Sequence, residues 1–137
     1  MIKLGKVSQN NLETCHPKLR QLVTELARRI PKALDFSVTC GHRGEREQNE
    51  ALESGWSTKA WPDSLHNKEP SLAVDLAPYP VDWKDRAQFA RLAGYVQAVA
   101  DDLGIKIRWG GDWDQDGRTA DERFVDMPHF ELAKEEW

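Results

Sequence analysis

The stretch HNKEPSLAVD, residues 66–75, ends on an aspartate that is flanked by the apolar residues Val74 and Leu76. A charge in apolar surroundings is costly to bury, and an extended chain avoids this cost because alternate side chains of a strand point to opposite faces. One face then carries Leu72, Val74 and Leu76, and the other carries Ala73, Asp75 and Ala77. The stretch therefore predicts a strand over 72–77 whose polar face is a carboxylate between two small side chains.

The segments on either side of this strand predict an α+β fold. Apolar stripes with helical spacing predict helices over 17–30 and 84–103, and a surface helix with thin apolar content is expected over about 44–54, before Gly55. Alternating or β-rich runs predict strands over 35–40, 72–77, 105–109 and 128–132. Long loops are expected over 56–71 and 110–123, and loops of this length in small domains are often functional. Helices mixed with short strands in hairpin-like connections favour α+β.

Composition limits the function. The chain of 137 residues suits one domain, and its net charge of −4 argues against nucleic-acid binding. No apolar run approaches the roughly 20 residues of a membrane span, and the N-terminus lacks a signal-peptide core, so we expect a protein made in a cytosol without an export signal of its own. Cys15 and Cys40 lack CxxC spacing, which favours two reduced thiols over a disulfide.

Two histidines and two aspartates stand at the ends of predicted elements. His66 precedes the strand of Asp75, His129 lies on the polar face of the last strand, and Asp126 comes three residues earlier with Pro128 between. Two imidazoles and a carboxylate suit Zn²⁺ with an open fourth position, and a carboxylate outside the metal shell can act as general base. Residue types alone still favour an ordinary alternative, in which His66 is a solvated loop residue and His129 a hydrogen-bonded strand residue.

The order of these residues, however, resembles a known family. Ser64-Leu65-His66, then Ala73-Val74-Asp75, then Asp126-Met127-Pro128-His129 is similar to zinc peptidases related to D-alanyl-D-alanine carboxypeptidases, with their pattern SxHxxGxAxD followed by an acid and a histidine three apart. Phage endolysins that are L-alanyl-D-glutamate peptidases resemble this chain most, also in CGHRGEREQNEAL (40–52) and GIKIRWGGDWDQDG (104–117). The spacing from His66 to Asp75 is two residues longer than the pattern, and Ser71 replaces its glycine.

The resemblance implies a hedgehog/DD-peptidase-like fold, with a small, mostly antiparallel sheet and helices packed on one side. It also implies roles for individual residues: zinc ligation by His66, Asp75 and His129, general base and acid catalysis by Asp126, and binding of the substrate carbonyl or oxyanion by Arg43. Ser64 would bind substrate or brace its loop, and Gln48 would orient Arg43 or the substrate. Without the resemblance, a surface ion pair is the simpler interpretation of Arg43.

The function implied is hydrolysis of a peptide bond in bacterial peptidoglycan, between L-alanine and D-glutamate. Two alternatives stay open, a D-alanyl-D-alanine carboxypeptidase and a non-catalytic zinc-containing wall-binding module. Residues 1–137 would form a single catalytic domain without a wall-binding domain. The resemblance further implies a monomer that waits in the host cytoplasm until a separate holin-like protein opens the membrane, and that then reaches the periplasm and cell wall.

Two further features are less specific. Asp112, Asp114 and Asp116 alternate like the start of a calcium loop, and Asp121 or Glu122 is a further candidate ligand, but Arg123 occupies the position where an EF-hand needs glutamate. A looser Ca²⁺ site beside Asp126 or a solvated acidic loop are both open. We also expect His42 to be non-catalytic, and three tryptophans to pack rather than bind sugar, namely Trp83, Trp109 and Trp113.

Overall fold

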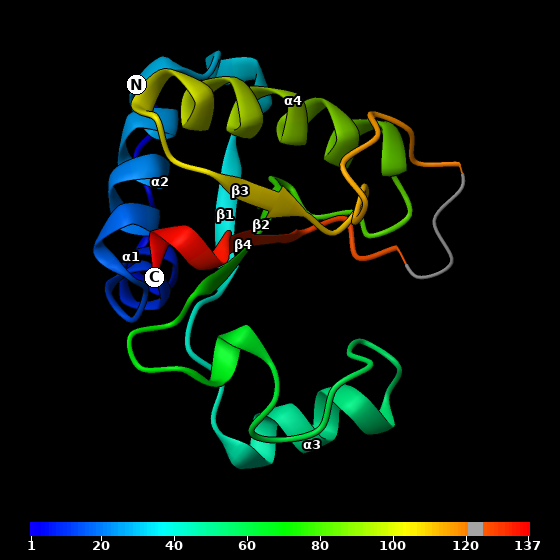
Figure 1. Cartoon of the computed structure of the whole chain (residues 1–137). Coiled ribbons are helices and arrows are strands. Elements are labelled where there is room, and N and C mark those ends of the chain that lie inside the picture. The colour runs from blue at the N-terminus through cyan, green and yellow to red at the C-terminus, as the bar shows by residue number, and fades with distance from the viewer. Residues whose placement is uncertain (121–124) are drawn as a thin grey trace.

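A four-stranded antiparallel sheet forms the centre of the protein, which we describe from a computed structural model for residues 1–120 and 125–137 (Figure 1). Its order is β1-β2-β4-β3, so the two strands that carry the predicted ligands are neighbours in the middle of the sheet. The strands are β1 (Phe36–Cys40), β2 (Ala73–Pro78), β3 (Ile107–Trp109) and β4 (His129–Leu132). Each predicted strand is present, and no strand end differs from its predicted position by more than two residues.

Helices cover the sheet, as α4 packs on β2 and β3, α2 packs on α4, and α1 packs on β1. The helices are α1 (Lys6–Glu13), α2 (Pro17–Arg29), α3 (Glu45–Glu53) and α4 (Arg86–Leu103), and the 3₁₀ turns are η1 (Lys32–Leu34), η2 (Leu65–Asn67) and η3 (Lys134–Glu136). In Figure 1, α3 lies apart from the other helices, below the sheet and close to the green segment with η2. The α+β prediction is confirmed.

The alternation predicted for β2 is present. The side chains of Leu72, Val74 and Leu76 belong to the hydrophobic core, whereas Asp75 points the other way and its side chain is 13% exposed. Ala73 and Ala77 are also buried, so the opposite face of β2 is covered except around the carboxylate. The sheet thus separates an apolar core from a polar centre on its other face.

Helix α1 was not predicted, because it packs through polar groups rather than through an apolar stripe. The Ser8 hydroxyl accepts a hydrogen bond from the Val38 amide (3.0 Å), and the Asn11 amide donates to the Val38 carbonyl (2.8 Å). β1 lies at the edge of the sheet, where unpaired backbone groups need partners. Helix α1 supplies these partners, and Leu12 is its buried apolar residue.

Local signals explain the ends of the other helices. Asp85 caps α4 by accepting a hydrogen bond from the Gln88 amide, which places the first turn at Arg86 rather than at 84. Gly104 ends α4 in left-handed backbone, a conformation that favours glycine. No helix among the described residues is long and apolar enough to cross a membrane. Cys15 and Cys40 are both free thiols, as predicted.

Candidate active site

His66, Asp75 and His129 converge at the polar face of the sheet. The register of β2 and β4 places Asp75 directly opposite His129, and the turn η2 brings His66 to the same point. The Nε2 atom of His66 lies 3.1 Å from Asp75 Oδ1 and 3.2 Å from His129 Nδ1, and His129 Nδ1 lies 3.4 Å from Asp75 Oδ1. His66 and His129, which are 63 positions apart in the sequence, therefore meet at Asp75, and the three side chains bring one donor atom each to the same point.

These donor atoms fit the shape of a zinc site. Ligands about 2.0–2.2 Å from one ion at tetrahedral angles lie roughly 3.3–3.6 Å from one another, close to the separations seen here. The second nitrogen of each ring has a protein acceptor, since His66 Nδ1 lies 2.7 Å from the Gly41 carbonyl and His129 Nε2 lies 2.8 Å from Glu131 Oε1. Such contacts fix the orientation of a metal-binding imidazole and leave its other nitrogen free to coordinate.

Glu131 is a site residue whose role the sequence did not indicate. It follows His129 by two positions on the same face of β4, and Arg108 on β3 donates to its other oxygen (2.9 Å). The side chain is 9% exposed. Burial alone would raise the pKa of Glu131, but its hydrogen bond with His129 lowers it below the usual range. Strand alternation is the signal that pointed to this residue, because it placed His129 and Glu131 on one face.

The charges show that the centre of the site favours a cation. Burial alone would lower the pKa of His66, but the Asp75 carboxylate raises it, to about 10. The pKa of His129 is also raised, because the hydrogen bonds with Asp75 and Glu131 outweigh burial. Burial acts to raise the pKa of Asp75, yet the two imidazoles hold it far below its usual range. Without a metal, a proton on His66 therefore balances the Asp75 carboxylate.

Asp126 lies at the edge of this cluster, with Oδ2 3.9 Å from His129 Nδ1. A turn closed by the His129 amide and the Asp126 carbonyl joins it to β4, as the proline between them predicted. Gly110 permits this arrangement, because an added Cβ there would lie 2.2 Å from the Asp126 carbonyl oxygen. Burial and the nearby charge of Asp75 raise the pKa of Asp126 to about 6. A carboxyl group with such a pKa suits proton transfer near neutral pH.

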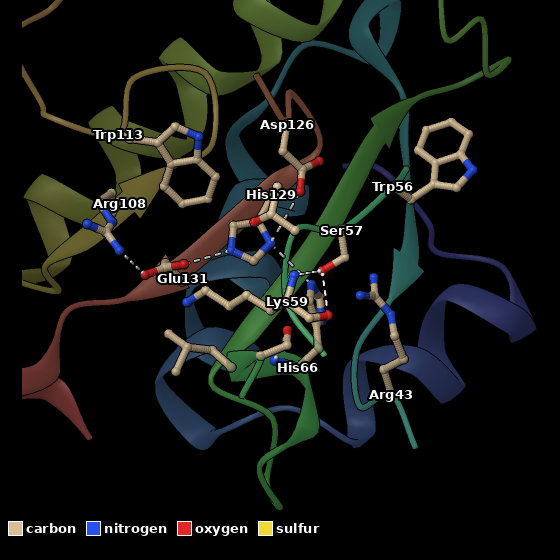
Figure 2. A pocket seen from close by; sticks show the side chains of 13 residues that line it. Arg43, Trp56, Ser57, Lys59, His66, Arg108, Trp113, Asp126, His129 and Glu131 are labelled. Atoms are coloured by element: carbon tan, nitrogen blue, oxygen red, sulfur yellow. Dashed lines mark hydrogen bonds and ion pairs between the residues drawn. The ribbon is translucent and has the colours of Figure 1, made fainter. Parts of the chain in front are cut away.

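Arg43 extends toward the same centre from the loop before α3. Its guanidinium Nη2 lies 3.6 Å from Asp75 Oδ2, and its Nη1 donates to Gln48 Oε1 (3.0 Å). The side chain is 14% exposed, so this ion pair is largely shielded from solvent rather than on the open surface. A cavity opens over the cluster, and Figure 2 shows Arg43 directed into it from the side opposite Arg108. A fixed cation in this place can stabilise negative charge that develops on a substrate.

Gln48 is fully buried and all its amide contacts are with the protein. Its oxygen accepts from Arg43 and from the Asn67 amide (3.1 Å), and its nitrogen donates to the Ser57 hydroxyl (2.9 Å) and the Lys59 carbonyl (2.7 Å). These contacts favour the prediction that Gln48 orients Arg43 over the prediction that it binds substrate. They also tie α3 to η2 and to the loop at 57–59.

Ser64 has a bracing contact of the kind expected for a turn. Its hydroxyl accepts from the His66 amide (3.2 Å), while the Asn67 side chain accepts from the Ser64 amide, which forms a capping box around η2. Ser64 also lines the cavity, so both predicted roles are compatible with its place. His42 Nε2 lies 3.2 Å from Glu69 Oε1, and neither residue lines this cavity.

Cys40 offers a second way to complete a metal site. One potential ligand atom each of Cys40, His66 and Asp75 lies within 4.8 Å of the other two. The Cys40 sulfur, however, lies 3.8 Å from His66 Nδ1, the nitrogen that contacts the Gly41 carbonyl. The set with His129 uses the opposite nitrogen and is the better match to zinc geometry.

A cavity of about 320 Å³ opens over the cluster (Figure 2). On one side of His129 lie Trp113, Glu131 and Arg108, whose guanidinium lies 5.3 Å from the Trp113 ring centroid. On the other side lies Trp56, which is exposed. Trp56, Lys59 and Arg108 were not predicted as site residues, because loops and strand ends bring them together and no short motif marks them.

The aspartate-rich loop after β3 folds around its own carboxylates. Asp112 accepts from the Asp116 and Gly117 amides (3.2 and 2.8 Å), and Gly117 takes positive φ. One oxygen each of Asp112, Asp114 and Asp116 lies within 4.8 Å of the others, as the calcium prediction requires. The further candidates, Asp121 and Glu122, lie outside the described residues.

Two imidazoles and a carboxylate in metal-like geometry, with a raised-pKa acid and an arginine beside an open cavity, define a candidate hydrolase centre on an α+β domain. The family described as phage L-alanyl-D-glutamate peptidase matches residues 1–133. The L-alanyl-D-glutamate peptidase of Escherichia phage T5 is 30% identical to this chain, over 96% of this chain and 98% of that protein. The crystal structure of the Serratia marcescens L-Ala D-Glu endopeptidase ChiX superposes with a TM-score of 0.75 at 28% identity, covering 98% of this chain and 92% of that one.

The chain belongs to the phage L-alanyl-D-glutamate peptidase family. The resemblance found in its motifs is thereby confirmed, and so is the prediction that it is a peptidoglycan-cleaving peptidase with the fold of these enzymes.

Proposed function

We propose that this protein hydrolyses the L-alanyl-D-glutamate bond of peptidoglycan with Zn²⁺ held by His66, Asp75 and His129. The observation that carries this proposal is the mutual approach of the three donor atoms to 3.1–3.4 Å, with the outer nitrogens of both rings in contact with protein acceptors. Family membership supplies the substrate, since the phage T5 relative carries the name of that peptidase.

The residues around the site contribute to different steps of the hydrolysis. Bound zinc supplies Lewis acidity and activation of water. Asp126 accepts the proton that the attacking water loses and delivers it to the leaving amine. Arg43 faces the carbonyl oxygen of the scissile bond, where its charge stabilises the oxyanion as the bond to water forms. Gln48 holds Arg43 in this orientation.

Metal analysis combined with digestion of purified muropeptides tests the proposal. We expect one zinc per chain in the active protein, and new termini at L-alanine and D-glutamate in mass spectra. Asp126→Ala is expected to retain zinc and to lose activity. Normal wall lysis by Asp126→Ala, or an active protein that contains no metal, would contradict the proposal.

The same digestion separates the two rivals. A carboxypeptidase releases free D-alanine from the end of the stem peptide, whereas the proposed endopeptidase leaves that end intact. A binding module without turnover releases nothing. Asp126 and Arg43 both line the cavity, an arrangement that a binding module does not need.

We further propose that the protein acts as a monomer on the cell wall after a separate holin-like protein has opened the membrane. Until then it stays in the host cytoplasm. Sedimentation of the purified chain tests the first point, and lysis of intact cells with and without a coexpressed membrane-permeabilising protein tests the second. Lysis without that protein would contradict the second point.

A second metal is proposed for the loop of Asp112, Asp114 and Asp116. A Ca²⁺ ion bound there would help to position Asp126, and Asp121, which lies outside the described residues, would be its fourth ligand. Activity titrated with calcium, with zinc kept saturated, is expected to rise and then reach a plateau. An activity that does not respond to calcium contradicts this proposal.

A further inference from the structure

The active-site cavity continues past Trp56 into a second hollow. Trp56, Arg43 and Asp126 line both, so the two hollows meet at the catalytic residues. The second hollow is also lined by Trp83, by the carboxylate-bearing side chains of Glu47 and Glu50 on α3, and by the hydroxyls of Thr39 and Ser54. We call it the tryptophan arm, and we call the side with Lys59 and Arg108 the cationic arm.

The tryptophan arm has an aromatic wall. The Trp56 and Trp83 rings meet edge to face with centroids 5.6 Å apart, and Trp83 stacks on Phe89 at 5.7 Å and 20°. Phe89 is buried in the core, whereas Trp56 and Trp83 are 57% and 48% exposed. Large aromatic faces left in water beside a catalytic centre mark a binding surface. The expectation that Trp83 packs is met on its Phe89 side, and its exposed surface needs another explanation.

Flat aromatic faces beside carboxylates and hydroxyls suit a saccharide. The rings cover the apolar C–H faces of a sugar, and acidic and hydroxyl side chains bond with its hydroxyl and amide groups. The cationic arm differs, since Lys59 and Arg108 line it: Arg108 pairs with Glu131, and the Lys59 ammonium suits a substrate carboxylate. The two arms therefore match the two sides of the proposed bond, a sugar-bearing side and an acidic peptide side.

The distance along the substrate supports this assignment. In peptidoglycan the L-alanine is joined through a lactyl group to the muramoyl sugar, so about two chain units, or roughly 7 Å, separate the scissile carbonyl from the sugar. A bond between the terminal D-alanines lies three residues further away, roughly 10 Å more. A sugar platform that adjoins the catalytic residues is thus useful to an enzyme that cuts after the first residue of the stem.

We infer that Trp56 and Trp83 bind the muramoyl sugar on the amino side of the scissile bond and thereby favour cleavage next to the glycan. This inference rests on the proposed function and adds a substrate subsite to it. It makes the glycan a part of the recognised substrate rather than only a support for the peptide.

The test compares two substrates with the zinc-loaded protein. One is N-acetylmuramoyl-L-Ala-D-Glu with its following stem residues, and the other is the same peptide with a D-lactoyl group in place of the muramoyl group. Both keep the amide at L-alanine, so that only the sugar differs. We expect the wild type to show a kcat/KM at least tenfold higher for the muramoyl substrate.

Variants assign the preference to the aromatic wall. Trp56→Ala and Trp83→Ala are expected to bring the ratio of the two kcat/KM values close to one, while Trp83→Phe keeps most of it. Trp137→Ala removes a tryptophan of similar exposure (51%) beside the cationic arm and is expected to leave the ratio unchanged. Circular dichroism and zinc content establish that each variant is folded and loaded.

The possible outcomes separate the two ideas. Cleavage of both substrates at equal rates by the wild type overturns the sugar subsite and leaves the proposed function intact. The subsite is also overturned if both alanine variants keep the wild-type ratio of the two kcat/KM values. The same holds if kcat/KM falls equally on both substrates. If the zinc-loaded wild type cuts neither substrate, the proposed function fails and the subsite fails with it.

Discussion

Single carboxylates tune the candidate metal site, and Glu131 is the clearest example. It accepts from His129 and is itself held by Arg108. Glu131→Gln keeps the shape but removes the charge that favours the metal-binding form of the imidazole. We expect zinc affinity to fall about 10–100-fold, the usual effect of losing such an outer contact.

A zinc titration against a competing chromogenic chelator measures this effect. Glu135→Gln is the matched control, because Glu135 is exposed and pairs with Lys106 away from the histidines. Equal affinities for the wild type and Glu131→Gln would show that Glu131 supports only the fold.

Asp126 is expected to reduce stability in the metal-free protein while serving catalysis. Its pKa in the folded state is about 6, above the ordinary value of 3.8, so the folded protein disfavours the ionised form. The resulting destabilisation is present above pH 6 and disappears as the pH falls below the unfolded pKa. Asp126→Asn is therefore expected to stabilise the metal-free protein at pH 8, by on the order of 2–3 kcal/mol.

Denaturant unfolding of chelator-treated protein at pH 8 and at pH 4 measures this gain. It should be small at pH 4, where the carboxyl is protonated in the folded state and only partly ionised in the unfolded state, whose pKa is 3.8. Asp101→Asn, at an exposed position of α4, serves as control. An equal gain at both pH values would mean that charge is not the cause.

At the scale of elements, Gln48 connects α3 to two loops of the site. Gln48→Ala removes a buried hydrogen bond each from Arg43, from the Asn67 amide and from the Lys59 carbonyl, and we expect a loss of about 1–3 kcal/mol in stability. Since Arg43 loses its orientation, kcat is expected to fall at least tenfold with a smaller change in KM. Exposed Gln97→Ala is the control.

Gln48→Glu separates the two functions of this side chain. A glutamate still accepts from Arg43 and Asn67 but cannot donate to Ser57 or to the Lys59 carbonyl. Recovery of kcat in Gln48→Glu would assign the effect to Arg43, and continued loss would assign it to the loop at 57–59. An unchanged kcat in Gln48→Ala would exclude a positioning role.

The sequence predicted the elements whose packing is apolar and missed those that pack through polar groups. The strand of Asp75 and helix α4 were evident from their alternating or helical stripes. Helix α1 was not, because Ser8 and Asn11 attach it to the sheet edge by hydrogen bonds. The turn η2 was likewise hidden within the loop predicted over 56–71, where its capping box depends on Ser64 and Asn67.

For the whole molecule, a site residue could be predicted from the sequence only where a short motif marks its role. The order of His66, Asp75 and His129 indicated the candidate ligands, and the sheet register explains why they meet. Trp56 and Lys59 come from the loop after α3 and Arg108 comes from β3, so their approach to the cavity follows only from the assembled fold. The order of the candidate ligands is visible along the sequence, whereas the walls of the cavity must be found in three dimensions.

At the scale of the whole molecule, we expect the stability gained on zinc binding to depend on pH. Without metal, the pKa of His66 is about 10 in the folded state and 6.5 ordinarily. Its protonation therefore stabilises the metal-free protein fully below pH 6.5, and this stabilisation is lost as the pH rises through 10. Zinc needs the unprotonated ring, so binding releases protons and tightens with rising pH.

The difference in Tm between zinc-loaded and chelator-treated protein is thus expected to widen from pH 6 to pH 9. Each proton released adds about 1.4 kcal/mol of binding free energy per pH unit, and tighter binding to the folded state raises its stability. Differential scanning calorimetry at fixed free zinc measures this difference. His42→Ala, which changes a histidine outside the cluster, should give the same widening. A difference that stays constant with pH would mean that the metal does not displace protons from His66 and His129, and that the ligands lie elsewhere.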